Sequence, residues 1–238
     1  SINVTNADGT AQVTAIDNTG IDARNYNGGA VDIAVDNITA DDYGISVYND
    51  SASTSVSVTV NGNITVTDDT GIDIDNYGSG VVTVNASNPD GTSLITSVND
   101  HGVLVDNYNG GAVDVTVDNV TVEEEGVDVD NDAAGTSVSV TVNGTLTSIG
   151  EEGITVDNYG SGGITVNVTN ADGTAAVISD EDGIELENYN GGGVTVVVDN
   201  VTNNTNFGIE VDNEDIGTTF VSVTVNQTVT SAGADAID

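Results

Sequence analysis

Hydrophobic residues alternate with polar ones in short runs along this chain, and one such run recurs throughout. A glycine precedes two apolar residues at alternate positions and then an asparagine, as in Gly71-Ile-Asp-Ile-Asp-Asn76. Alternation over about four to eight residues is typical of a half-buried β-strand. Spacings of 24 to 31 residues separate the marker glycines, which are Gly20, Gly44, Gly71, Gly102, Gly126, Gly153, Gly183 and Gly208, with Ala236 in the last place.

Each interval between marker glycines is expected to hold two further strands. A valine run at period two follows the marker strand, as at Val56, Val58 and Val60, and then comes a shorter run such as Ile64 and Val66. Three strands of this length cannot bury their apolar face alone, but stacked copies bury it continuously. The pattern therefore predicts an all-β, parallel β-helix of about nine coils, each of 24 to 31 residues.

Longer identities group the coils in threes. The segment Asn25-Tyr-Asn-Gly-Gly-Ala-Val-Asp32 recurs 82 residues later at 107–114. The 238 residues are thus 2.9 copies of an 82-residue unit, and we expect one continuous solenoid over 1–238, as a segment of a longer repeat protein. Three tandem immunoglobulin-like sandwiches are the alternative, because such a domain has a similar size. The threefold subrepeat favours the solenoid.

The charge balance excludes several classes of protein. There are 39 acidic residues against one Lys or Arg and one His, so the formal net charge is −38, and no cysteine is present. This argues against a nucleic-acid binder with a basic surface. No apolar run reaches the roughly 18 residues of a membrane span. On the marker strands the alternation points carboxylates outward, and acids also crowd the turn before each marker glycine, so we expect two acidic stripes side by side.

Like charges this close need screening. Carboxylates one coil apart, at about 4.8 Å, repel by about 0.9 kcal/mol per pair in bulk water. Either bulk salt or divalent cations screen them, and calcium suits clustered carboxylates. No segment matches an EF-hand loop. A diffusely solvated face is the alternative to calcium sites, whose candidate ligands are the outward residues Asp73, Asp75, Asp106, Asp128, Asp130 and Asp157.

Two further ladders follow from the alignment of coils. An amide side chain both donates and accepts, so stacked asparagines can satisfy one another. We predict a structural ladder of the residues that end each marker strand, Asn25, Asn49, Asn76, Asn107, Asn131, Asn158, Asn188 and Asn213. The next position is aromatic in two coils of three, which predicts a turn stack of Tyr26, Tyr77, Tyr108, Tyr159 and Tyr189. The alternative function is a glycan- or polysaccharide-binding module that uses the acidic or the tyrosine stripe, because aromatic rings can contact sugars.

No catalytic constellation emerges. Acidic pairs occur throughout the chain, so a pair of carboxylates does not identify a glycosidase. His101 lies in the acidic turn Asn99-Asp100-His101-Gly102 and is expected to be a solvated turn residue. The outward positions of the second strand, such as Ser57 and Thr59, are too irregular for the threonine array of an ice-binding face. We therefore expect a protein that is not an enzyme.

With coils of variable length, rich in Gly, Asn, Thr and Val, and without cysteine, the whole chain resembles the β-solenoid passengers of bacterial autotransporter and two-partner-secreted adhesins. The resemblance is one of style and implies right-handed coiling, which parallel crossovers also prefer. It further implies an extracellular or cell-surface location and a role as a rigid adhesin stalk or fibre. Expected partners are copies of the chain, joined end to end or laterally through unpaired strand edges, and a host-surface or glycan ligand.

Overall fold

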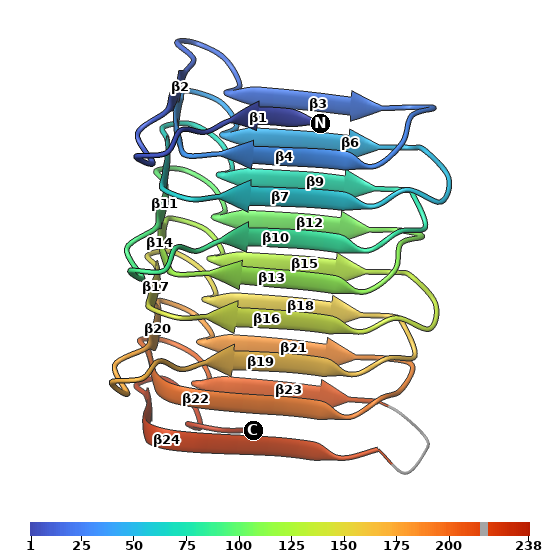
Figure 1. Ribbon diagram of the computed structural model, residues 1–238. Coiled ribbons are helices and arrows are strands. Elements are labelled where there is room, and N and C mark those ends of the chain that lie inside the picture. The colour runs from blue at the N-terminus through green and yellow to red at the C-terminus, as the bar shows by residue number, and fades with distance from the viewer. Residues whose placement is uncertain (215–218) are drawn as a thin grey trace.

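A computed structural model of the chain describes residues 1–214 and 219–238. The strands that follow the marker glycines form one parallel sheet of eight, which we call the marker sheet (Figure 1). Its members, in chain order, are β3 (Ile21–Asn25), β6 (Ile45–Asn49), β9 (Ile72–Asn76), β12 (Val103–Asn107), β15 (Val127–Asn131), β18 (Ile154–Asn158), β21 (Ile184–Asn188) and β23 (Ile209–Asn213).

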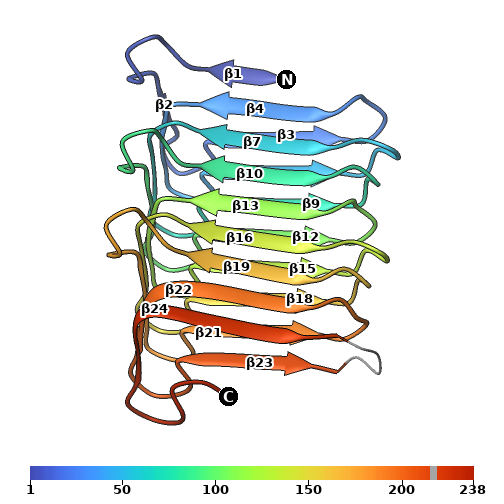
Figure 2. The ribbon, with the colours of Figure 1, turned by 60° about the horizontal axis from the view of Figure 1, so that its bottom comes forward.

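The second and third strands of the coils form the other faces (Figure 2). The second strands are β1 (Ile2–Val4), β4 (Val31–Val35), β7 (Val56–Val60), β10 (Val82–Ala86), β13 (Val113–Val117), β16 (Val138–Val142) and β19 (Ile164–Val168). The third strands are β2 (Gln12–Thr14), β5 (Asn37–Ala40), β8 (Asn63–Val66), β11 (Leu94–Ser97), β14 (Asn119–Val122), β17 (Thr145–Ser148) and β20 (Ala176–Ser179). In the last two coils the second and third strands join into one continuous strand, which is β22 (Val194–Asn203) in one coil and β24 (Val221–Ser231) in the next.

The strand pairing confirms the predicted parallel β-helix. Within the described ranges every recorded ladder is parallel and joins equivalent positions of adjacent coils, as where Val84 pairs with Val58 on one side and Val115 on the other. This arrangement excludes tandem sandwiches. The predicted count of nine coils is too high, because the marker sheet has eight strands and the segment after Ala236 adds only an isolated bridge between Ile209 and Ile237.

Alternation along each strand produces the core. In β9 the side chains of Ile72 and Ile74 are fully buried, whereas the two aspartates between and after them point outward. β-Branched side chains pack well on a pleated surface, and here like residues stack on like residues from coil to coil. The buried residues form a single cluster that runs from Ile21 to Ile209.

The marker glycines are required by close approach between coils. A Cβ atom at Gly71 would lie 2.6 Å from the carbonyl oxygen of Gly102, and one at Gly126 would lie 2.6 Å from that of Gly153. A backbone carbonyl in a β-ladder cannot move aside to make room for a Cβ atom, whereas the end of a flexible side chain can. A side chain at this position would therefore push adjacent coils apart.

One loop per 82-residue unit protrudes from the stack, and the three loops lie on the left of Figure 1. In the loop at 87–93, Asn88 Oδ1 accepts hydrogen bonds from the N–H groups of Asp90 and Thr92, at 3.2 and 3.0 Å. The buried carboxylate of Asp118, one coil away, accepts from the N–H of Asn88 at 2.9 Å. Asp36 and Asp199 anchor the loops at Asn6 and Asn170 in the same way.

Candidate functional site on the marker sheet

The asparagines that end the marker strands form a continuous chain of hydrogen bonds. Each Nδ2 donates to Oδ1 of the next asparagine, from Asn25 to Asn213, at 2.7–3.1 Å. The six internal members are at most 1% exposed. Most also donate to a turn carbonyl, as Asn107 does to Gly111 at 2.9 Å. The amides thus satisfy one another inside the corner where the marker strands end.

The five tyrosines of the predicted turn stack fall into two groups. Tyr77 and Tyr108 stack with ring centroids 4.3 Å apart, and so do Tyr159 and Tyr189. Tyr26 does not reach Tyr77 directly. Between them lies Tyr48, which tilts against both at 5.6 Å.

Two features of the sequence explain this division. Tyr48 was missed because it occupies an outward strand position of β6 rather than the turn position that the alignment followed. Between the two groups the middle coil has Asp132, which interrupts the column of rings. Stacking covers one face of each ring in these pairs.

The outward carboxylates of the marker sheet lie in two columns of different character. The column nearer the strand ends is acidic on six consecutive strands, at Asp75, Asp106, Asp130, Asp157, Glu187 and Asp212. The other column contains Asp22, Asp73, Asp128, Glu185 and Glu210, but Ser46, Leu104 and Thr155 interrupt it. One column is thus a continuous row of like charges, and the other is diluted by neutral side chains.

This crowding shifts the titration of the acids. Burial raises the pKa of Asp73 to about 7, and repulsion by Asp75 and Asp106 adds to the shift. Burial likewise raises the pKa of Asp157 to about 6, with repulsion from the acids on both neighbouring strands. These carboxyls are therefore protonated at higher pH than free aspartate is.

Of the six predicted calcium ligands, only Asp128 converges with other ligand groups. Its carboxylate lies in a group with His101 and Glu125, in the turns that precede the marker strands. In the described part of the chain, none of the convergent groups includes the other five, which are Asp73, Asp75, Asp106, Asp130 and Asp157. Their side chains stand side by side along the sheet and do not point at a common centre. The remaining groups are Asp100, His101 and Glu124, then Glu125, Glu151 and Glu152, and finally Glu152, Asp182 and Glu185.

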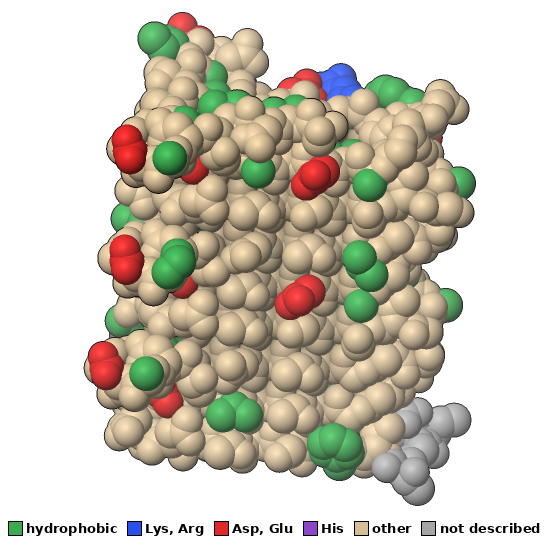
Figure 3. All heavy atoms as spheres, in the orientation of Figure 1, with side chains coloured by type: hydrophobic (Ala, Val, Ile, Leu, Met, Phe, Trp, Pro, Cys, Tyr) green, Lys and Arg blue, Asp and Glu red, His purple; other side chains and the backbone are tan. Residues whose placement is uncertain are grey.

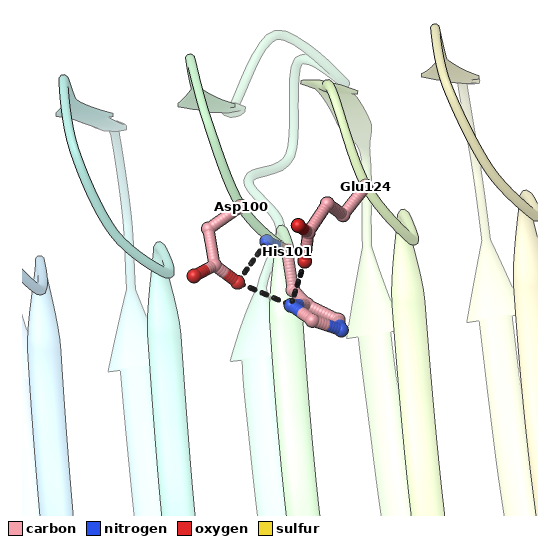
Figure 4. Close-up of side chains that lie close together, drawn as sticks. All are labelled: Asp100, His101 and Glu124. Atoms are coloured by element: carbon pink, nitrogen blue, oxygen red, sulfur yellow. Dashed lines mark hydrogen bonds and ion pairs between the residues drawn. The ribbon is translucent and has the colours of Figure 1, made fainter.

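The expectation that His101 is a solvated turn residue is wrong. Its side chain is only 17% exposed, and its Nδ1 contacts the Asp100 carboxylate and lies 3.3 Å from Glu124 (Figure 4). On the opposite side of the ring, Nε2 lies 2.9 Å from Glu125 and 3.9 Å from Asp128. Burial alone would lower the pKa of His101, but bonds to Glu125 and Asp100 outweigh it and raise the pKa to about 10.

A threonine column is present on the third strands, rather than on the second strands that the alternation suggested. The paired outward residues are Thr14, Thr39, Thr65, Thr96, Thr121, Thr147, Ile178, Thr202 and Thr230. The neighbouring column contains asparagines that are already bonded to backbone, as Asn119 is to Gly91 and Ser93. The array is therefore a single column, interrupted by Ile178.

The second-strand face differs from the marker sheet in charge. Figure 3 shows this face, on which acidic side chains are few. Among the outward residues of the second strands that are described, the acids are Asp32 and Asp114, and these lie one 82-residue unit apart. Most of the acidic residues thus lie on the marker sheet and in the turn before it.

No family model, curated protein or solved structure matches the chain. In the ranges that the structure describes, there is no helix with the length and apolar character needed to cross a membrane.

Proposed function

We propose that this chain is a structural repeat segment, which serves as a rigid stalk or fibre of an extracellular or cell-surface adhesin and carries out no catalysis. The observation that supports the proposal is the unbroken stack itself. Ladders join each coil to the next in equivalent register, and the asparagine chain runs beside them from Asn25 to Asn213. In such a solenoid each repeat contacts only its neighbours, and length is gained by adding coils.

Stiffness follows from the number of bonds that join adjacent coils. Between the coils of β9 and β12, five residue pairs register on the marker sheet alone, and the second and third strands add further ladders. Bending the rod would stretch the bonds on one side while the opposite side is already close-packed. We therefore assign the fold a mechanical role.

The acidic surface belongs to the same proposal. It keeps a long rod soluble, and salt or divalent cations, with calcium as the candidate, screen its charge. Contact between copies of the chain, end to end or lateral, is the proposed mode of assembly, because strand edges pair readily with one another.

Glycan binding is the second candidate function. Tyr26 is 54% exposed and Tyr159 is 41% exposed, so part of each ring is open to solvent. Against this candidate, stacking at 4.3 Å already covers one face of each ring in the best-stacked tyrosine pairs, so fewer ring faces are left for a sugar. The stalk is therefore the function that the geometry favours.

Pulling on single molecules held at residues 1 and 238 tests the stalk. Sequential rupture is expected, with contour increments of about 9 nm for a coil of about 27 residues at roughly 3.4 Å per residue. A glycan array probed with the chain and with its Tyr26→Ser and Tyr159→Ser variants is the companion assay. Two results together would refute the stalk and support the glycan-binding module. The rod would unfold at forces that unfold ordinary domains, and the chain would bind glycans that neither variant binds.

A further inference from the structure

We infer that His101, Glu125 and Asp128 form a binding site for one divalent transition-metal ion of the zinc type, which joins two adjacent coils. Nε2 of the histidine and one carboxylate oxygen of each acid all lie within 4.8 Å of one another. The inference is independent of the stalk proposal, because a structural rod needs no such ion. It also differs from the calcium hypothesis, whose candidate ligands lie mostly on the outward columns.

The coil pitch brings the three side chains together. His101 and Glu125 occupy the same position in adjacent coils, directly before marker glycines, and the N–H of Gly102 donates to the carbonyl of Glu125 at 3.0 Å. Asp128 is the second residue of β15 and points outward beside them. The backbone register that builds the solenoid therefore fixes the separation of the ligands.

The distances fit a small ion. Nε2 lies 2.9 Å from Glu125 Oε2 and 3.9 Å from Asp128 Oδ2. Zinc binds nitrogen and oxygen ligands at about 2.0–2.2 Å, so one ion between these atoms requires only small side-chain movements. Water would complete its coordination on the solvent side, since all three residues are partly exposed.

The other side of the imidazole ring is prepared for this role. Nδ1 contacts the Asp100 carboxylate, whose Oδ1 also accepts from the Thr70 hydroxyl at 2.9 Å and from the N–H of His101 at 2.7 Å (Figure 4). A carboxylate at Nδ1 orients the ring and keeps a proton on that nitrogen, so Nε2 is the nitrogen that gives up its proton when a metal binds. Asp100 is thus a positioning residue and not a ligand.

The surroundings of Glu125 Oε2 are consistent with this site. That oxygen is shielded from solvent, and its partner in the structure is Nε2 of His101, 2.9 Å away. Buried carboxylate oxygens normally have a partner. The acidic group of Glu152, Asp182 and Glu185 differs, because Asp182 already accepts from Asn206 Nδ2 at 2.7 Å and from the N–H of Phe207 at 2.6 Å. That group carries no proposal.

The donor set selects the class of ion. Imidazole favours zinc, copper, nickel or iron, whereas calcium and magnesium prefer sites made only of oxygen ligands. When the ion binds, it takes the place of the proton on Nε2 of the imidazolium. One proton is therefore released to solvent for each ion bound. The charge of the ion then balances the two carboxylates.

Because the chain contains one histidine, the test can follow that ring directly. The chelator-treated, dialysed protein is titrated with zinc chloride at physiological salt, and binding is followed by calorimetry and by the nitrogen resonances of the imidazole. We expect one ion per chain, a large shift of the Nε2 resonance, and affinity at least tenfold weaker in His101→Gln and Glu125→Gln. The Asp157→Asn variant, which removes one charge elsewhere on the marker sheet, should bind as tightly as the wild type.

Three outcomes would overturn the proposal. The first is zinc uptake that is equal in His101→Gln and in the wild type, since this would mean diffuse counterions on the acidic face. The second is an imidazole whose two nitrogen resonances stay unchanged at saturating zinc. This result is obtained on the wild-type protein and does not depend on whether a variant folds. An equal shift of the Nε2 resonance with calcium alone would likewise refute a site of the zinc type. None of these results bears on the stalk, which the pulling experiment tests.

Discussion

Replacing Asn107 with aspartate tests whether the buried amide ladder holds the coils together. Asn107 lies near the middle of the stack and is 1% exposed. Its Nδ2 donates to Asn131 Oδ1 at 2.7 Å and to the carbonyl of Gly111 at 2.9 Å, while its Oδ1 accepts from Asn76 at 2.8 Å. Aspartate has nearly the same shape but, when ionised, no donor. The variant would therefore point a carboxylate oxygen at two acceptors.

The expected loss follows from those contacts. Each of the two lost hydrogen bonds contributes about 0.5–1.5 kcal/mol net, and the buried oxygens left without a donor cost about 1–3 kcal/mol more. Together these terms give a decrease of about 2–6 kcal/mol in the free energy of unfolding at pH 7. Protonation at acid pH returns one O–H donor to the variant. The loss should therefore be smaller at pH 4.5.

Urea unfolding followed by circular dichroism at both pH values measures this effect. The matched control is Asn25→Asp at the end of the ladder, where the side chain is only half-buried and water can solvate the new charge. We expect a large decrease in the urea midpoint for Asn107→Asp at pH 7 and a small one for the control. Equal midpoints for the two variants, or no recovery at pH 4.5, would refute the reasoning.

Three further predictions concern the acids, the loops and the glycines. The pKa of Asp73 is about 7 in the folded chain and about 3.9 in the unfolded chain, so the folded state binds the proton more tightly. Stability should therefore fall as pH rises from about 4 to 7. In thermal melts at low salt, Asp73→Asn should show a smaller fall than the wild type. Asp118→Ala should cost about 1–3 kcal/mol and expose the loop at Asn88 to limited proteolysis. Gly126→Ala should destabilise by about 1–3 kcal/mol in urea unfolding, whereas Gly29→Ala, with open space around it, should not.

The strands could be predicted from the sequence because alternation is local. Val56, Val58 and Val60 are all fully buried in β7, as their period of two requires. The parallel register followed from the marker glycines, which align equivalent positions of coils of different length. The number of coils was overestimated, because a marker pattern at the end of the chain does not guarantee a full turn of the helix.

The environment of His101 was missed because its partners come from different parts of the chain. Asp100 is its neighbour in sequence, but Glu124, Glu125 and Asp128 belong to the next coil. A signal was nevertheless present in the sequence. Aligning the residues that precede the marker glycines places His101 beside Glu125, and reading across coils at that position would have predicted the contact.

The loop anchors show the same limit of local reasoning. Asp118 follows β13 directly, as an acid between two strands, and nothing in its own segment indicates that it is buried. Its carboxylate is satisfied by the N–H of Asn88 and by Nδ2 of Asn143, from the two neighbouring coils. Such a residue becomes recognisable only once the coils are stacked in the correct order.

The marker sheet supports two ladders that should respond differently to the surrounding solution. The six consecutive carboxylates from Asp75 to Asp212 form five neighbouring pairs, which together cost about 4 kcal/mol in bulk water. That is comparable to the whole stability of many domains, about 5–15 kcal/mol, so protonation or bound cations must relieve it. The asparagine ladder is uncharged and gains nothing from salt. Cohesion of the rod should therefore depend on pH and ions through the acidic columns and the acidic turns beside them, while the amides keep adjacent coils in register under all these conditions.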